Sequence, residues 1–111
     1  MDEISFEVQG SAPEPYLVTF VRRSPTNLSA YCSCPAGENG QYCKHRFAIL
    51  DGAENSLVSS NASDIQIVQS WLPGTDVEAA LLRVRELEKE AEEIKRELSS
   101  AKHALARAMR D

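Results

Sequence analysis

The sequence predicts an α+β fold, in which a small antiparallel sheet and a short helix precede a second short helix and a long C-terminal helix. Near the start of the chain, apolar and polar residues alternate as they do in strands. All three cysteines lie between positions 32 and 43. The last third carries apolar residues in heptads, without proline or glycine. These observations divide the 111 residues into the segments 1–52, 53–74 and 75–111.

Three strands are expected in the first segment. The stretch 4–8 alternates apolar and polar residues, and the stretch 16–23 is rich in β-branched and aromatic residues. The residues GSAPEP between them are typical of a turn. A third strand follows over 28–34, and Pro35 ends it because proline has no N–H to donate to a sheet. Strands joined by such short turns are expected to form an antiparallel sheet.

Three helices are expected after the sheet. A short one begins near Cys43 and ends near Gly52. A second is expected from Asn61, which offers an N-cap, and its apolar residues fall on one face. The third starts at a capping box formed by Thr75 and Glu78, and it meets no proline or glycine before the C-terminus.

The cysteines and one histidine are spaced as metal ligands. Side chains two residues apart in a strand point to the same face, so Cys32 and Cys34 present their sulfur atoms together. Cys43 and His45 cannot do so inside a helix, so Cys43 is expected just before the helix begins. Three thiolates and one imidazole match a closed tetrahedral zinc site with no position for a catalytic water. The sequence therefore predicts one structural Zn²⁺ per chain.

Two other interpretations of these cysteines are open. Isolated cysteines are often small buried hydrophobic residues, and a C-x-C pair can act as a thiol redox site. Neither interpretation accounts for the second pair, Cys43 and His45. The odd number of cysteines also argues against a disulfide framework, which needs pairs. The thiol redox protein stays as a second alternative function.

The pattern Cys32-x-Cys34, an eight-residue spacer and Cys43-x-His45 resembles the SWIM-type zinc finger, written C-x-C, a variable spacer, C-x-H. The flanking residues CSCP and CKH are similar to those common in that family, although the spacer is short for it. The resemblance covers about positions 4–52 and implies a β-β-α outline around the zinc. SWIM domains occur in Swi/Snf-type ATPases, Mutator-type transposases and ubiquitin ligases of the kinase-cascade class. The resemblance implies that the domain binds DNA or proteins.

The charge of the chain bears on the choice between DNA and a protein as the partner. The formal net charge is -5, and acidic residues outnumber basic ones both up to Ser60 and after it. Nucleic acids and anionic lipids attract basic surfaces, so this balance disfavours both as partners. DNA contacts would have to come from one basic group: Arg22, Arg23, Lys44 and Arg46. A DNA-binding accessory protein is therefore the first alternative function.

The long C-terminal segment has the period of a coiled coil. Its apolar residues occupy five unbroken heptads: Val77, Val84, Ala91, Leu98 and Leu105 at one core position, and Ala80, Leu87, Ile94, Ala101 and Ala108 at the other. In a parallel homodimer, Arg83 would face Glu88 of the other chain, and likewise Glu90 would face Lys95 and Glu97 would face Lys102. An antiparallel pair would set Glu90 against Glu97, so the charges favour the parallel dimer. The alternative is a solvated helix supported by i to i+4 ion pairs.

The sequence thus predicts a zinc-binding module that is dimerised through residues 75–111 and acts as a non-enzymatic adaptor for an unidentified protein partner. Motifs for phosphate, dinucleotide or nucleophilic chemistry are missing from the sequence. There is no run of about 18 apolar residues and no signal peptide, so no membrane contact is expected. We expect the protein in the cytoplasm, or in the nucleus of a eukaryote.

Overall fold

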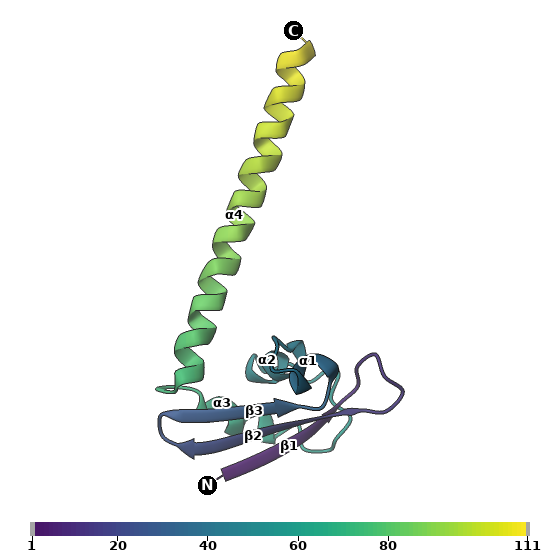
Figure 1. Ribbon diagram of the computed structural model, residues 1–111, viewed down its shortest axis with the longest axis vertical. Helices are drawn as coiled ribbons and strands as arrows, with labels where there is room; N and C mark the ends of the chain where they lie inside the picture. Colours follow the sequence, from purple (N-terminus) through teal and green to yellow (C-terminus); the bar gives the residue numbers. More distant parts are fainter. Residues whose placement is uncertain (1, 111) are drawn as a thin grey trace. The chain divides into compact units, whose positions relative to one another are not determined.

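The computed structural model describes residues 2–110. These residues belong to two compact units, Met1–Glu78 and Ala79–Asp111. The first unit holds a three-stranded sheet and three short helices, and the second consists of a long helix (Figure 1). The predicted α+β fold is confirmed. The first unit extends past the predicted boundary at residue 52, because the following helix packs into the same core.

The sheet is antiparallel, with strands β1 (Asp2–Val8), β2 (Tyr16–Ser24) and β3 (Asn27–Cys32) side by side in chain order (Figure 1). Phe6 pairs with Val18, and Val18 pairs with Cys32, so the three form one row across the sheet. All three are buried on the face that carries the core. The last residue of β3 therefore brings a thiol to the edge of the hydrophobic core.

Three short helices follow: α1 (Pro35–Glu38), α2 (Lys44–Leu50) and α3 (Asp64–Trp71). α1 was not expected, because the sequence PAGENGQ was interpreted as a loop. α2 and α3 bury one face each against the sheet, with Ile49, Leu50, Ile65, Val68 and Trp71 in the same cluster as Phe6 and Val18. Apolar residues that repeat about every 3.6 positions place one face of a helix in the core, and this burial stabilises helices that are too short to form alone.

The connection between α2 and α3 covers the outer edge of β1. Leu57 forms a β-bridge with Val8, and the Val58 N–H donates to the Glu7 carbonyl at 2.8 Å. Further along, the Asn61 side chain donates to the Ser5 carbonyl at 2.8 Å. An unpaired strand edge invites association with other chains, and this segment covers that edge from Ser5 to Val8.

The expected N-cap at Asn61 is wrong. α3 begins at Asp64, and Ser63 holds the capping position without a side-chain hydrogen bond. Asn61 instead fixes the start of the helix to β1 through Ser5, and its amide also donates to Asp64 Oδ2 at 3.3 Å. A long-range contact to the sheet has taken the place of the local cap.

The Thr75 half of the capping box before the long helix is confirmed, whereas the Glu78 side chain reaches the N–H of Gly74 and not that of Thr75. The Glu78 N–H donates to Thr75 Oγ1 at 3.3 Å, and Glu78 Oε1 accepts from the Gly74 N–H at 3.1 Å. Gly74 has a φ of 82°, which is favourable for glycine alone and ends the preceding segment. α4 (Asp76–Arg110) then continues for 35 residues.

Within its own unit, α4 is a solvated helix. Each side chain from Arg85 to Arg110 is exposed. An ion pair joins Arg83 and Glu86 on this helix, at 3.1 Å. None of the helices within residues 2–110 combines the length and the apolar character needed to cross a membrane.

Candidate metal centre

Three elements bring the four predicted ligands together. Cys32 is the last residue of β3, and Cys34 follows it as the N-cap of α1. Cys43 is the N-cap of α2 with an extended backbone, φ -130° and ψ 116°, and His45 lies in the first turn of that helix. Cys43 thus stands just outside the helix, as expected. Cys34 does not continue the strand, because the chain leaves β3 after Cys32 to enter α1.

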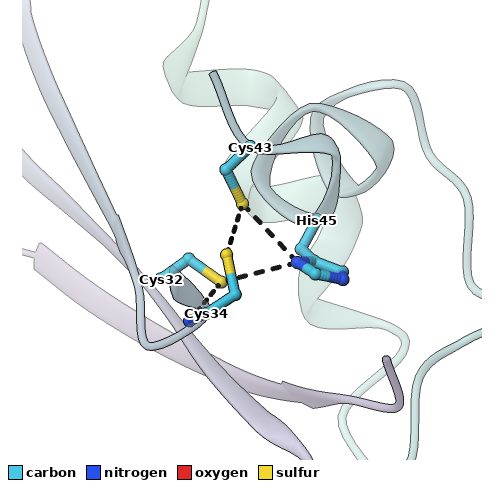
Figure 2. Close-up of side chains that lie close together, drawn as sticks. All are labelled: Cys32, Cys34, Cys43 and His45. Carbon is cyan, nitrogen blue, oxygen red and sulfur yellow. Dashed lines mark hydrogen bonds between the residues drawn. The ribbon is translucent and has the colours of Figure 1, made fainter. Parts of the chain in front are cut away.

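The donor atoms are arranged as the corners of a small tetrahedron (Figure 2). Cys34 Sγ lies 3.4 Å from Cys43 Sγ, and His45 Nδ1 lies 3.7 Å from Cys32 Sγ and 3.6 Å from Cys43 Sγ. All four atoms lie within 4.8 Å of one another. Zinc bonds of about 2.3 Å to sulfur and about 2.0–2.1 Å to nitrogen place tetrahedral corners about 3.6–3.8 Å apart. The donor set therefore fits one zinc ion.

The thiols are buried and free. Cys32, Cys34 and Cys43 are only 5%, 4% and 2% exposed, and no disulfide joins them. Backbone N–H groups point at the sulfur atoms, from Cys34 to Cys32 Sγ at 3.5 Å and from Gly37 to Cys34 Sγ at 3.3 Å. Such donors stabilise thiolates and orient metal ligands.

Gly37 allows this close approach. A Cβ at this position would lie 2.5 Å from the Cys32 carbonyl oxygen and 2.8 Å from Cys32 Cβ. Glycine lets α1 fold back against the end of β3, so that its own N–H reaches Cys34 Sγ. Gly37 was not predicted from the sequence, although a glycine three positions after a metal ligand can indicate close packing of the backbone.

Without a metal, the pKa values of two of the thiols are shifted in opposite directions. Burial raises the pKa of Cys32 to about 12, and the neighbouring thiols of Cys34 and Cys43 also raise it, whereas the Cys34 backbone N–H lowers it only in part. Burial opposes ionisation of Cys43 too, but the Arg46 backbone N–H and the side chains of Cys34, Cys32 and His45 lower its pKa to about 6. Thiolates this close together repel one another, and a divalent cation among them removes that repulsion.

The histidine ring is held from its far side. Nδ1 faces the sulfur atoms (Figure 2), and the ring packs against Tyr16 with centroids 5.1 Å apart. A Cβ at Gly10 would lie 3.1 Å from His45 Nε2 and 2.4 Å from Tyr16 Cε2. Gly10 therefore leaves the space that both rings need. In the sequence it was assigned to turn material, and nothing in its neighbourhood pointed to the metal site.

The four basic residues predicted as contacts do not share one environment. Arg22 and Arg23 lie near the end of β2, where the pairing with β3 shifts register. The Arg23 guanidinium donates to Ser29 Oγ at 2.9 Å and to the Tyr31 hydroxyl at 2.8 Å. Lys44 is exposed at the start of α2.

Arg46 has a structural position. It is half-buried, and it donates to the Ala30 carbonyl at 3.1 Å and to the Gln41 carbonyl at 2.6 Å. Ala30 belongs to β3, and Gln41 precedes Cys43 by two residues. The guanidinium therefore joins the strand that carries Cys32 to the segment that leads into Cys43. Its sequence position beside His45 had been interpreted as a surface contact.

The predicted dimerisation residues lie along α4. Val77 packs partly against the core of the first unit. Beyond it, large apolar side chains of the heptads are open to solvent: Leu87, Ile94, Leu98 and Leu105. The alanines between them, Ala91 and Ala101, are exposed as well.

Comparison with known proteins agrees with the geometry. Residues 6–51 match the family model of the SWIM zinc finger. A search of curated proteins and a search of solved structures found no match. The matched segment contains the whole Cys₃His cluster together with β2, β3 and α2. Residues 6–51 of this chain therefore form a SWIM zinc finger, in which Cys32, Cys34, Cys43 and His45 are positioned to bind one structural zinc ion.

Proposed function

We propose that this chain is a non-enzymatic protein-interaction module, in which a zinc-stabilised finger is doubled by a parallel two-stranded coiled coil. The observation that carries the proposal is the apolar stripe on α4. Leu98 and Leu105 are 53% and 58% exposed in the isolated chain, and Ile94 is 63% exposed. Burying a leucine or isoleucine side chain contributes about 1.5–3 kcal/mol, so a partner helix would stabilise α4.

A second copy of the chain is the partner that the charges favour. The positions flanking the stripe would set Arg83 opposite Glu88 of the other chain, with Glu90 opposite Lys95 and Glu97 opposite Lys102. Arg83 also has an intrahelical partner, Glu86 at 3.1 Å, which competes with the first pair. The other two pairs support the parallel register, because the antiparallel register opposes Glu90 to Glu97.

The metal centre supports a structural role for zinc. Four protein donors complete a tetrahedron, and a catalytic zinc site keeps one position for water or substrate. A finger of this size also has a small core, and small domains commonly depend on a metal for stability. We therefore propose that zinc maintains the fold of the finger and that recognition belongs to its surface.

A protein partner is favoured over nucleic acid. The net charge is -5, and of the basic residues on the finger, Arg23 and Arg46 already donate to groups of the fold. Binding to DNA would need a basic surface that neutralises several phosphates. We also place the protein in a reducing compartment, the cytoplasm or the nucleus, because zinc ligation requires free thiols.

The test of this proposal is sedimentation equilibrium of the zinc-loaded chain. We expect a dimer, and we expect Leu98→Lys to give a monomer because two lysines would meet at the centre of the seam. The control is Leu82→Lys. Leu82 is similarly exposed, at 58%, but its heptad position lies opposite the seam. A dimer that survives Leu98→Lys, or a monomer without any substitution, would contradict the proposed assembly.

A further inference from the structure

Asn39 and Gly40 form an exposed Asn-Gly pair inside the spacer between the ligand positions Cys34 and Cys43. In such a pair the glycine nitrogen can attack the side-chain carbonyl carbon of the asparagine, and glycine has no side chain to hinder the attack. A Cβ at Gly40 would meet no atom within 4 Å. Asn39 is the one asparagine of the chain that glycine follows, whereas leucine, serine and alanine follow the others: Asn27, Asn55 and Asn61.

The backbone of the folded finger keeps the reacting atoms apart. Ring closure needs the Gly40 nitrogen on the same side of the Asn39 Cα–C bond as Asn39 Cβ. Asn39 has φ -88° and ψ 8°. At this ψ the Gly40 nitrogen is eclipsed with the Asn39 nitrogen, and Cβ lies about 120° away around the tetrahedral Cα. The side chain of Asn39 therefore cannot react with Gly40 unless ψ changes.

Two hydrogen bonds at the end of α1 hold this conformation. The Gly40 N–H donates to the Gly37 carbonyl at 3.2 Å, and the Gln41 N–H donates to the Ala36 carbonyl at 2.9 Å. Gly40 has a φ of 68°, so the two bonds form a Schellman motif. The first of them also occupies the N–H of the attacking nitrogen. Ring closure therefore requires this bond to break as well as ψ to rotate.

α1 depends on the metal centre for its stability. It has four residues, none of them fully buried, and helices this short do not form alone. Its first turn is held by Cys34, whose Sγ accepts from the Gly37 N–H at 3.3 Å, and Cys43 follows Gln41 by two residues. Both cysteines are positioned to bind the same zinc ion, which would fix the two ends of the segment between them. Without zinc, α1 opens locally at a smaller cost in free energy.

We propose that Asn39 is a deamidation site that the zinc-loaded finger protects and the zinc-free finger exposes. The Gly40 nitrogen forms a bond to the side-chain carbonyl carbon of Asn39. The bond from this carbon to the side-chain nitrogen breaks, and ammonia leaves with the proton from the Gly40 N–H. Water then opens the resulting succinimide ring at either carbonyl. The net reaction consumes water and releases ammonia in equal amounts, and it leaves aspartate or isoaspartate at position 39.

The products would bind zinc less well than the original chain. Isoaspartate continues the backbone through its side chain, which adds a methylene group between Cys34 and Cys43 and displaces the Gly40 N–H from the Schellman motif. Both products also add a negative charge near a centre where three thiolates already exceed the charge of one zinc ion. Zinc does not reverse the reaction. A finger that stays without metal therefore passes to a form with lower affinity, and the time spent without metal is recorded in the chain.

The experiment is a time course of peptide mapping by mass spectrometry on the full chain, zinc-loaded or treated with a chelator. Both samples contain a thiol reductant at the same temperature and pH, so that only the metal differs. We expect aspartate and isoaspartate at position 39 to accumulate about tenfold faster without zinc. Asn27 and Asn61 are internal controls and should stay intact in both samples, because leucine and alanine hinder the nitrogen that follows. Equal rates at Asn39, or no reaction there in either sample, would overturn the inference.

A second measurement tests the consequence for the metal, with Asn39→Gln as the matched control. Glutamine keeps the amide, but its side chain is one methylene longer and does not close the five-membered ring. After the incubation without metal, zinc is returned and its affinity is measured by competition with a chelating dye. We expect the deamidated fraction of the original chain to bind zinc about tenfold or more weakly, and we expect Asn39→Gln to recover fully. Full recovery of the deamidated chain would contradict the loss of affinity.

Discussion

The unit Met1–Glu78 buries most of its large apolar side chains within itself, whereas α4 leaves most of its own in water. In the first unit, Phe6, Val18 and Phe20 are fully buried, and a Cys₃His cluster joins the sheet to α2. In α4, the heptad residues from Leu87 onward are exposed to solvent. We propose that each unit needs something that the chain does not supply: a metal for one, and a second helix for the other. Because the two needs are separate, each can be removed without the other.

The largest effect is expected from Cys43→Ser. This change removes a ligand held by the N-cap of α2, and apparent zinc-binding energies of about 10–16 kcal/mol in zinc-finger peptides exceed the stability of a small core. We expect residues 1–52 to become largely disordered while α4 remains helical. The measurement is the amide NMR spectrum, with Lys44→Ala as the control because Lys44 is not a ligand. A native-like spectrum of Cys43→Ser without metal would show that the finger folds by its core alone.

A smaller effect is expected from Gly10→Ala, which tests the far side of the same site. The added methyl group would lie 2.4 Å from Tyr16 Cε2 and 3.1 Å from His45 Nε2, so both rings must move. Changes to groups that orient metal ligands commonly weaken metal affinity about 10–100-fold. We expect about tenfold weaker zinc binding in competition with a chelating dye, and no change for Ser11→Ala. Equal affinities for Gly10→Ala and the unmodified chain would mean that the loop moves without disturbing His45.

The smallest effect is expected in α4, from Glu90→Lys. In the parallel dimer this residue faces Lys95 of the other chain, and exposed ion pairs contribute about 0.2–1 kcal/mol. We expect a slightly lower dimer melting temperature at low salt, restored by the additional change Lys95→Glu. Zinc content should be the same in all three proteins. A single variant more stable than the unmodified dimer would favour the antiparallel register, in which Glu90 opposes Glu97.

The same comparison shows what could be predicted from the sequence. The strands were found within about two residues of their ends, because alternation reports directly on which face is buried. The metal ligands were found because two-residue spacings join Cys32 to Cys34 and Cys43 to His45. The coiled coil stays a prediction, because the contacts that would confirm it lie between two chains.

The missed features depend on contacts that neither hydrophobic periodicity nor ligand spacing reports. α1 forms because Pro35 suits the first turn, Cys34 accepts from Gly37, and Gly37 packs on the end of β3. Arg46 reaches carbonyls of Ala30 and Gln41, which a local pattern does not reveal. Gly10 matters through two rings that lie beside it only in the folded chain.

The central claim is that each chain holds one structural zinc ion and pairs with a second copy, and native mass spectrometry tests it most directly. The protein would be purified without added metal and without chelator, so that one spectrum counts chains and ions together. The account predicts two chains with two zinc ions. A metal-free species would contradict the structural zinc, and a zinc-loaded monomer would contradict the pairing of α4 with its own copy.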